Sequence, residues 1–317
     1  MQRIHSSKKN MGWLLAGILT LALVGCGDQG TATSGSSSEA ASSTASQASS
    51  IDAIKERGVI RIAVFSDKPP FGYIDKEGKN QGYDIEFGKR IAKDLLGDES
   101  KVEFVLTEAQ NRVDVLKSNK VDITLANFTV TPERAEQVDF ANPYMKTAIG
   151  VVSPKNAAIQ TVEQLTGKKL LINKGTTAET YFAENFPNVE QMKFDQNTET
   201  FAALKDGRGA ALAHDNTLLY AWVKENPDFE VSINQVGPND FIAPAVKKGN
   251  TELRDWLNQE LVQLAQEKFF HDAYNKAIKP FYGDNIDPEN VVIEGGKVDS
   301  AEHANHTTSS EAVSAAQ

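Results

Sequence analysis

Apolar and polar positions along the chain predict short buried strands that alternate with amphipathic helices. Apolar runs bounded by turn residues indicate strands at 59–65, 101–106, 121–126, 150–152, 169–173, 192–194, 210–213 and 241–246. Apolar positions at helical spacing indicate helices at 51–57, 85–96, 112–118, 161–165, 177–185, 198–205, 216–224 and 252–270. Asp84 is expected to cap the helix at 85–96. This alternation is typical of α/β proteins in which helices flank mostly parallel sheets.

Two stretches of the chain have the same internal order. Residues 116–127 and 204–215 each contain a helix end, a turn and an apolar strand, followed by a polar residue, Asn127 or Asp215. Ligands of open α/β sheets gather at the carboxyl ends of strands. We therefore expect two similar lobes whose strand ends face one another across a cleft.

The expected lobes are not continuous in sequence. Lobe one comprises residues 51–146 and 241–283, and lobe two comprises residues 147–240. Two segments, near 146–151 and 236–242, are expected to cross between the lobes and to act as a hinge. The C-terminal tail, residues 284–317, loses the apolar pattern and is predicted to be largely disordered.

The first 25 residues have the pattern of a signal peptide. Three basic residues precede an apolar stretch, 11–24, that is too short for a typical membrane span. The stretch ends in Leu-Val-Gly-Cys, which resembles the lipobox of bacterial lipoproteins and implies cleavage before Cys26 and acylation of its sulfur. An ordinary signal peptide with an incidental cysteine is the alternative. Residues 26–50, rich in Ser and Ala, are expected to form a flexible tether after the lipidated Cys26.

Composition and charge argue against several classes of function. The chain carries 33 Lys and Arg against 43 Asp and Glu, a net charge of −10, and shows no basic stripe that would suit a nucleic acid. Its single cysteine allows neither an intramolecular disulfide nor a cysteine metal cluster. The five histidines form no H-x-x-x-H pair, so neither a metal nor another cofactor is expected.

Arg134 is the first candidate for ligand binding. Thr131, Pro132 and Glu133 before it suit the N-cap and first turn of a helix. A cation there lies at the unfavourable end of the helix dipole, unless an anion binds to the guanidinium and the backbone N–H groups together. A surface arginine paired with Glu133 or Asp139 is the alternative.

The turn at residues 174–177 is the second candidate. Thr176 and Glu179 have the spacing of a capping box, and Gly175 allows the backbone to approach a ligand closely. A plain helix start would have the same residues. The third candidate is Asp215, for which an N-cap role is the alternative.

Together these candidates suit the two ends of an amino acid. Arg134 with the backbone N–H groups of Thr129 and Thr177 suits a carboxylate, and Asp215 with oxygen atoms near Asn127 and Thr129 suits an ammonium group. An anion site and a cation site across one cleft describe a free α-amino acid. Burial of both charges is tolerable only if each is paired.

The chain resembles family 3 of the bacterial solute-binding proteins, which deliver polar amino acids to ABC importers. The resemblance rests on G-Y-D-I-E at 82–86, F-T-V-T-P-E-R at 128–134, F-A-N-P-Y at 140–144, K-G-T-T at 174–177 and H-D at 214–215. It implies a two-lobed periplasmic-binding-protein type II fold. It also implies that Arg134 binds the α-carboxylate, that Asp215 binds the α-ammonium group, and that Thr129 and Thr177 donate hydrogen bonds.

Within the family the chain is most similar to the cysteine-binding lipoproteins. The shared segments are V-F-S-D-K-P-P-F-G-Y at 64–73, E-A-Q-N-R at 108–112, L-A-N-F-T at 125–129 and H-D-N-T-L-L at 214–219. The resemblance implies cysteine as the ligand, with cystine, aspartate or glutamate as alternatives, and a side-chain pocket lined by Phe71, Arg112, Phe128 and Tyr144. In the related aspartate/glutamate-binding branch an arginine near position 112 binds the acidic side chain. Arg112 could instead be a residue of the helix surface.

The resemblance also implies partners and a location. The expected protein is a monomer without catalytic activity that serves a membrane permease and its ATPase. The acylated Cys26 would anchor it to the lipid bilayer at the outer face of the cytoplasmic membrane, or the protein would lie in the periplasm or cell envelope. An enzyme similar to cyclohexadienyl dehydratase is the alternative of another class. His214 or Glu108 could then be the general acid, but no acid, base and orienting group stand together.

Overall fold

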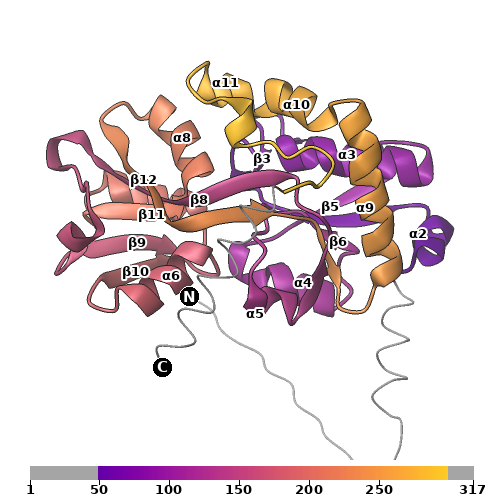
Figure 1. The fold of residues 1–317 in the computed structure, drawn as a ribbon, viewed down its shortest axis with the longest axis horizontal. Helices are drawn as coiled ribbons and strands as arrows, with labels where there is room; N and C mark the ends of the chain where they lie inside the picture. Colours follow the sequence, from indigo (N-terminus) through magenta and orange to yellow (C-terminus); the bar gives the residue numbers. More distant parts are fainter. Residues whose placement is uncertain (1–48, 299–317) are drawn as a thin grey trace, which may run out of the picture. The chain divides into compact units, whose positions relative to one another are not determined.

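The structure, a computed structural model, describes residues 49–298, which fall within one compact unit. The predicted signal peptide, Cys26 and nearly all of the tether lie outside the described residues, as do residues 299–317. Two five-stranded sheets and a small three-stranded sheet form the framework (Figure 1). The predicted α/β class, with helices flanking the sheets, is confirmed.

The first sheet has the strand order β5-β1-β6-β13-β7. Its strands are β1 (Ile60–Val64), β5 (Val102–Leu106), β6 (Ile123–Thr124), β7 (Val138–Phe140) and β13 (Ala245–Lys247). β1 is parallel to β5 and β6, whereas β13 is antiparallel to both of its neighbours, so the sheet is mixed. Ile62 of β1 packs with the helix α3 (Tyr83–Leu96), and Ala63 packs with α4 (Arg112–Lys117). Burial on both faces explains why β1 is a continuous apolar run.

The second sheet has the strand order β10-β9-β11-β8-β12. Its strands are β8 (Met145–Pro154), β9 (Lys169–Asn173), β10 (Glu190–Phe194), β11 (Ala211–Asp215) and β12 (Phe229–Ile242). β9 is parallel to β10 and β11, and β8 is antiparallel to β11 and β12. The helices that pack on it are α6 (Thr177–Asn185), α7 (Asn197–Lys205) and α8 (Asn216–Glu225).

The small sheet and the remaining short elements connect these parts. The small sheet contains β2 (Asp67–Lys68), β3 (Gly72–Ile74) and β4 (Asn80–Gln81). The other short elements are α2 (Ile51–Arg57), η1 (Ala109–Asn111), α5 (Pro132–Ala135), η2 (Lys155–Ala157), η3 (Val162–Leu165) and η5 (Pro288–Asn290). β2 carries Lys68, a buried lysine.

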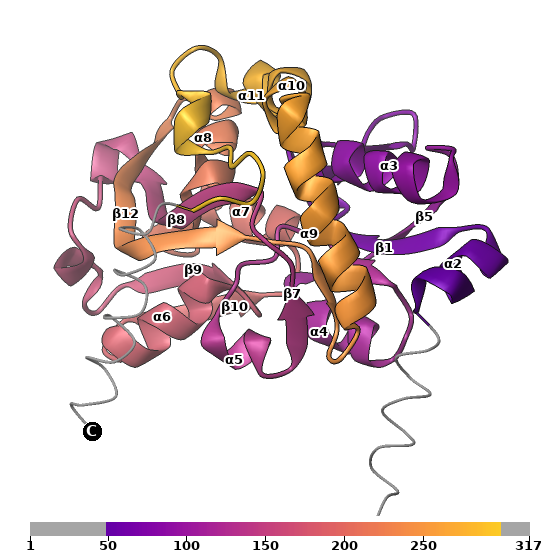
Figure 2. The same ribbon diagram turned by 45° about the vertical axis from the view of Figure 1, so that its right-hand side comes forward.

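The long strands β8 and β12 lie side by side and run between the two sheets (Figure 2). They pair antiparallel, with Ile242 opposite Met145 at one end. At that end Val130 N donates a hydrogen bond to Phe241 O (2.9 Å), which ties β12 to the half of the protein built on the first sheet. The two predicted crossing segments thus lie in one two-stranded ribbon.

The helix α3 begins differently from the prediction. Its N-cap is Gly82 rather than Asp84, and Gly82 has a φ of +122°. A Cβ atom added to Gly82 would lie 2.2 Å from Phe71 O, so only glycine fits there. Asp84 therefore lies within the first helical turn, fully buried, and its carboxylate contacts groups outside the helix.

Two predicted strands are shorter than expected because of the backbone. The strand expected at 121–126 is confined to β6, since Ala126 and Asn127 have positive φ values of 35° and 45°. The strand expected at 241–246 is divided between β12 and β13 around Pro244, which has no N–H group to donate.

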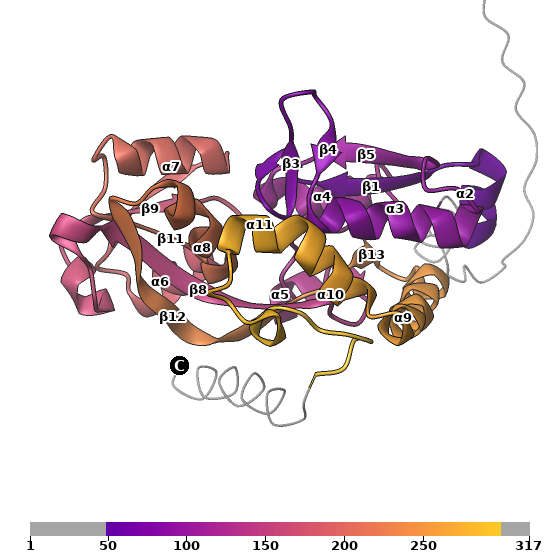
Figure 3. The ribbon, with the colours of Figure 1, turned by 90° about the horizontal axis from the view of Figure 1, so that it is seen from above.

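The long helix predicted at 252–270 is divided in two. α9 (Thr251–Gln266) ends before Lys268, whose φ is +55°, and α10 (Phe269–Ala273) follows. η4 (Tyr274–Ile278) and α11 (Lys279–Tyr282) continue the chain. α10 packs against α3 and α11 against α8, so these helices contact both halves of the protein (Figure 3).

Residues 284–298 pack against the body, which corrects the expectation of a largely disordered tail for this part of it. Val291, Val292 and Ile293 are at most 4% exposed. Lys146 N donates to Val291 O (2.7 Å) and Ile293 N donates to Tyr144 O (3.1 Å), so this stretch lies beside the start of β8. Three apolar residues among polar ones are too few to indicate a strand from the pattern alone.

Candidate functional site

Arg134 lies in α5 and is held by two backbone carbonyl groups. Its Nη1 donates to Thr129 O (2.7 Å), and its Nη2 donates to Gly175 O (2.9 Å). Thr129 belongs to the half of the protein built on the first sheet (the first half), and Gly175 belongs to the half built on the second sheet (the second half). The alternative partner Asp139 pairs with Lys248 instead (2.9 Å). Because α5 is a single turn, its dipole is small, and these carbonyl groups determine where the guanidinium lies.

Arg112 is the first residue of α4 and is only 3% exposed, so it is not a residue of the helix surface. Its donors reach the carbonyl oxygens of Ala109 (2.9 Å), Ala126 (3.2 Å), Asn127 (2.9 Å) and Gly175 (2.9 Å). The last of these contacts joins the first half of the protein to the turn between β9 and α6. Arg112 and Arg134 therefore share Gly175 as an acceptor.

The ring of Phe128 packs against both guanidinium groups. Its centroid lies 4.6 Å from Arg112 Cζ and 5.0 Å from Arg134 Cζ. Burial lowers the pKa of Arg134 to about 10. Burial, and then the charge of Arg134, lowers the pKa of Arg112 well below its ordinary value. Arg112 is buried and Arg134 is partly buried, and two cations this close together make the site favourable for an anion.

Gly175 meets the opposite half of the protein by a close backbone approach. It has a φ of +74°, and an added Cβ atom would lie 2.4 Å from Gln110 Cα. Its N–H donates to Glu179 Oε2 (2.6 Å) at the start of α6. The approach that the sequence indicates for this glycine therefore occurs toward the first half, where both arginines lie.

Asp215 ends β11 and is 5% exposed. Its Oδ2 accepts hydrogen bonds from Lys68 Nζ (2.6 Å) and from Asn127 Nδ2 (3.0 Å), both in the first half of the protein. Asp215 occupies the N-cap position of α8, but its side chain makes no capping hydrogen bond. Helix capping, the alternative role of Asp215, therefore does not explain where its carboxylate lies.

The charge of Asp215 is stabilised by its neighbours. Burial favours the protonated carboxyl group, but Lys68 and His214 together outweigh burial and hold the pKa of Asp215 below its usual range. His214 lies beside it and accepts a hydrogen bond from Asp215 N at Nδ1 (2.7 Å). Burial, together with the charge of Lys68, lowers the pKa of His214, so the imidazole is neutral at pH 7.

Lys68 was not among the residues that the sequence singled out. It lies on β2, is 1% exposed, and its Nζ lies 5.3 Å from the centroid of the Phe65 ring. The available signal was a lysine just after the carboxyl end of an apolar strand and before Pro69 and Pro70. That position would have placed an ammonium group at the same sheet edge as Asn127.

Asp84 was also missed as a site residue. Its Oδ1 accepts from Tyr144 Oη (2.7 Å) and its Oδ2 accepts from Asn127 N (2.8 Å). Asn127 and Ala126 both have positive φ, so the carboxylate of Asp84 holds a backbone turn that side-chain-bearing residues adopt rarely. That turn presents Asn127 to Asp215 and to Arg112.

The other predicted residues lie around this cluster in different roles. Thr176 is the N-cap of α6, and its hydroxyl donates to Asn173 O (2.7 Å). Thr177 is the first residue of that helix, and the ring centroid of Phe71 lies 5.9 Å from Lys68 Nζ. Tyr144 is fully buried and stacks on Phe270, with its hydroxyl on Asp84.

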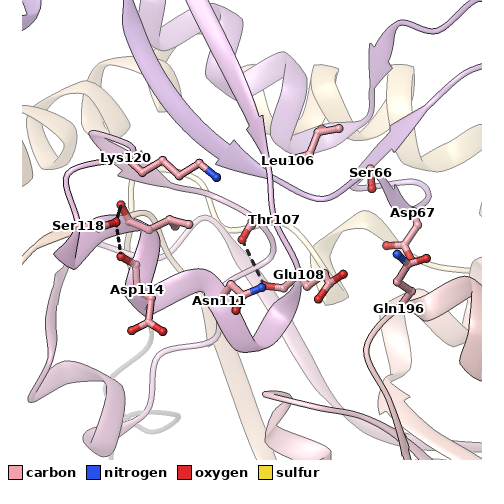
Figure 4. A pocket seen from close by; sticks show the side chains of 11 residues that line it. Ser66, Asp67, Leu106, Thr107, Glu108, Asn111, Asp114, Ser118, Lys120 and Gln196 are labelled. Atoms are coloured by element: carbon pink, nitrogen blue, oxygen red, sulfur yellow. Dashed lines mark hydrogen bonds between the residues drawn. The ribbon is translucent and has the colours of Figure 1, made fainter. Parts of the chain in front are cut away.

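Two cavities are lined by residues of both halves, and the second of them includes residues of the cluster. One, of about 450 Å³, opens where Ser66 and Glu108 face Gln196 of the second half (Figure 4). The other, of about 360 Å³, is lined by Arg134 and Thr177 among others. Asp215 lines neither of these two, and its hydrogen bonds to Lys68 and Asn127 join the halves directly.

Residues 49–298 contain neither a membrane-spanning helix nor a metal-binding group of side chains. No helix in this range is long and apolar enough to cross a membrane. Within the same range, no group of three or more His, Cys, Asp or Glu side chains is placed to hold a metal ion.

Comparisons with known proteins show which family the chain is similar to. The family described as bacterial extracellular solute-binding proteins, family 3, matches residues 60–280. The solute receptor for L-cysteine of Neisseria gonorrhoeae is 60% identical, with a TM-score of 0.76, and the match covers 77% of this chain and 100% of the receptor. The cysteine-binding protein of Campylobacter jejuni is 61% identical, with a TM-score of 0.76 and coverage of 77% and 98%. The glutamine-binding protein GlnH of a Bacillus subtilis ABC transporter is 31% identical over 268 residues, 84% of this chain and 95% of GlnH.

Proposed function

The chain belongs to family 3 of the bacterial extracellular solute-binding proteins, and from this premise we propose that it captures free cysteine and delivers it to an ABC importer. Its relatives are binding components of transporters rather than enzymes, and this chain is an amino-acid-binding protein of the same kind. The choice of cysteine is supported by two cysteine-binding proteins at 60% and 61% identity.

In the proposed complex, the two ends of the amino acid bind to opposite halves of the protein. Arg134, beside Arg112, takes the α-carboxylate, and Asp215 takes the α-ammonium group. The most direct support comes from two sets of contacts between the halves. The guanidinium groups that pack on Phe128 donate to Gly175 O of the second half. Asp215 of the second half accepts from the side chain of Asn127 in the first. A ligand carboxylate can replace the neutral carbonyl as an acceptor and makes stronger, charge-assisted hydrogen bonds.

Opening and closing of the two halves would admit and retain the ligand. We assign residues 51–146 and 241–283 to lobe one and residues 147–240 to lobe two, with β8 and β12 as the hinge between them. The assignment is supported by the two sheets, whose strands come from these ranges. The closed arrangement would form the surface that the permease recognises.

The protein acts outside the cytoplasm, as its family does. We propose that it does so as a monomer and that acylation of Cys26 anchors it to the bilayer, with residues 26–50 as a tether. The sequence around Cys26 supports the anchor, because the only cysteine of the chain follows the apolar stretch directly.

Isothermal titration calorimetry tests the ligand. The full chain is titrated with cysteine under reducing conditions, and separately with cystine, aspartate, glutamate and glutamine. We expect cysteine to bind most tightly. Tighter binding of any other member of this set would replace cysteine as the ligand, and failure of all five to bind would overturn the proposal that the site takes a polar amino acid.

Arg134→Ala tests the site with the same measurement. We expect the affinity for cysteine to fall by more than about tenfold, because a buried charge-assisted contact is worth more than about 1.4 kcal/mol. Arg254→Ala is the matched control, since Arg254 pairs with its neighbour Asp255 at the surface (2.7 Å). Equal affinities of the two variants would rule out the carboxylate role of Arg134.

A further inference from the structure

The helix α7 of the second half does not cap its own N-terminus. Its N-cap residue is Gln196, whose side chain makes no capping hydrogen bond. Glutamine is not one of the residues that cap helices well, and the first N–H groups of a helix have no acceptor within the helix. The start of α7 therefore needs an acceptor from another part of the chain.

Asp67 of the first half is that acceptor. Its Oδ2 accepts hydrogen bonds from Asn197 N (2.8 Å) and Thr198 N (3.2 Å), and its Oδ1 accepts from Asn197 Nδ2 (2.9 Å). Asp67 and Gln196 both line the cavity of about 450 Å³ between the halves (Figure 4). The N-terminus of a helix in one half is thus capped by a carboxylate of the other.

This cap is stronger than a hydrogen bond between neutral groups. Hydrogen bonds from backbone N–H groups to a carboxylate are charge-assisted, and the helix dipole favours a negative charge at the N-terminus. α7 contains nine residues, so its dipole is larger than that of the single turn α5. Separation of Asp67 from α7 therefore has a cost that an ordinary contact between two surfaces does not have.

β2 places two consecutive side chains against the second half. Successive side chains of a strand point to opposite faces. Lys68 is buried, with its Nζ on Asp215 Oδ2 (2.6 Å), whereas Asp67 is partly exposed and reaches the start of α7. The three hydrogen bonds of Asp67 go to α7 rather than to the residues proposed to bind the amino acid.

A second contact between the halves lies beside the first. Gln110 Nε2 of the first half donates to Asp195 Oδ1 (2.9 Å), and the same oxygen accepts from Lys174 Nζ of its own half (2.8 Å). Asp195 comes two residues before Asn197, in the turn between β10 and α7. This turn is therefore held to the first half at both of its ends.

We propose that Asp67 is a positioning residue that latches the two halves together and thereby sets how long the amino acid stays bound. The inference rests on the proposed function and deepens it. A hinge rotation that separates Asp67 from α7 breaks three hydrogen bonds and leaves the helix without its cap. Because the ligand leaves only after the halves open, the latch slows release without contacting the ligand.

Release of cysteine from the full chain measures the latch. The chain is loaded with radiolabelled cysteine under reducing conditions, and the loss of label is followed after an excess of unlabelled cysteine is added. We expect Asp67→Ala to release cysteine about tenfold faster, because charge-assisted hydrogen bonds are lost. The association rate should change little, since most changes at an interface alter dissociation. Asp67→Asn keeps one acceptor oxygen and should release cysteine at an intermediate rate.

Asp75→Ala is the matched control. Asp75 also accepts from two backbone N–H groups and one side-chain amide, those of Glu77 (3.0 Å), Lys79 (2.8 Å) and Gln81 (2.8 Å). All of these groups lie in the first half, between β3 and β4. We expect this variant to release cysteine at the rate of the unmodified chain. Equal rates for Asp75→Ala and Asp67→Ala would overturn the assignment of the latch.

A cap within the second half separates the latch from simple support of α7. Gln196→Ser places a good capping residue at the N-cap, where its hydroxyl can accept from the first N–H groups. Combined with Asp67→Ala, it restores a cap to α7 but not the contact between the halves. We expect the combined variant to keep the fast release. A return to the rate of the unmodified chain would show that Asp67 only supports the helix.

The same measurements distinguish failure of this inference from failure of the proposed function. Cysteine that binds to the unmodified chain and leaves Asp67→Ala and Asp67→Asn at the unmodified rate would overturn the latch and leave the proposed function intact. Failure of cysteine to bind to the unmodified chain would overturn the proposed function instead.

Discussion

At the scale of single residues, the site depends on a carboxylate, that of Asp84, which does not contact the amino acid in the proposed complex. Asp84 accepts from Asn127 N and from Tyr144 Oη, and through Asn127 it positions Asp215 and Arg112. Burial raises the pKa of Asp84 to about 6, and the hydrogen bond from Tyr144 opposes that rise. Asp84 is therefore a positioning residue whose carboxylate is costly to bury.

Asp84→Ala should destabilise both the fold and the site. It leaves Asn127 N and Tyr144 Oη without their acceptor, and each unsatisfied buried group costs about 1–3 kcal/mol. We expect the free energy of unfolding in urea to fall by about 2–4 kcal/mol and the affinity for cysteine to fall about tenfold. Asp84→Asn keeps an acceptor for Asn127 and is the milder control; equal losses in the two variants would contradict the positioning role.

The same carboxylate predicts a pH dependence. Its pKa in the folded protein is above the value of about 3.9 in the unfolded chain, so the neutral form is favoured by folding. Its contribution to stability is fully present below about pH 4 and is lost as the pH rises through about 6. Asp84→Asn should lack this part of the pH dependence of unfolding.

Sequence reasoning found the residues with distinctive motifs and missed those defined by tertiary contacts. Arg134, Arg112 and Asp215 follow from strand ends and family motifs, and the structure brings them together at one cluster. The sequence position of Asp84 suits a helix cap as well as it suits a buried carboxylate within the first helical turn. Its true environment depends on Gly82, whose positive φ shifts the start of α3.

At the scale of elements, the pattern works best where one face of a regular element is buried. β9 and α6 have the predicted bounds, 169–173 and 177–185. The errors fall at positive φ values, those of Ala126 and Asn127 after β6 and of Lys268 after α9, and at Pro244 before β13, which has no N–H group. The sequence has no strong local signal for left-handed residues other than glycine.

The turn between β9 and α6 provides a test at this scale. Gly175→Ala adds a Cβ atom 2.4 Å from Gln110 Cα of the other half, whereas Gly167→Ala, at the same φ of +74°, adds one with nothing within 4 Å. Both variants bear the backbone cost of about 1 kcal/mol for a side chain at positive φ. We expect only Gly175→Ala to weaken cysteine binding as well, by tenfold or more in calorimetry. Similar affinities of the two variants would show that the halves do not need to approach at Gly175.

At the scale of the whole molecule, the first sheet is built from segments that are distant in sequence, whereas the second comes from the continuous range 145–242. β13, at 245–247, inserts between β6 and β7 of the first sheet after the chain has completed the second. The internal repeat predicted two similar lobes, because each copy ends in a strand with a polar residue at its carboxyl end, but it did not predict the position of β13. Residues 291–293 lie outside both copies of the repeat. The repeat therefore could not predict that Val292 pairs with Met145 at the start of β8.

His271 helps to fasten this last segment to the body. Its Nδ1 lies 2.9 Å from Glu294 Oε1 and its Nε2 lies 2.9 Å from Glu289 Oε1, on both sides of the buried residues 291–293. Burial opposes ionisation of the imidazole, but its hydrogen bonds to Glu294 and Glu289 outweigh burial and raise the pKa of His271. The protonated form is therefore favoured by folding, and this part of the stability is lost as the pH rises above the raised pKa.

A chain that ends at Gly283 should accordingly be less stable than one that ends at residue 298. Loss of Val291, Val292 and Ile293 removes three buried apolar side chains, and we expect the free energy of unfolding in urea to fall by about 3–5 kcal/mol near pH 5.5. The difference between the two chains should narrow as the pH rises through the raised pKa of His271, because its ion pairs favour the longer chain only while the imidazole is protonated. A chain that unfolds at the same urea concentration with and without residues 284–298 would show that this segment does not stabilise the hinge beside β8.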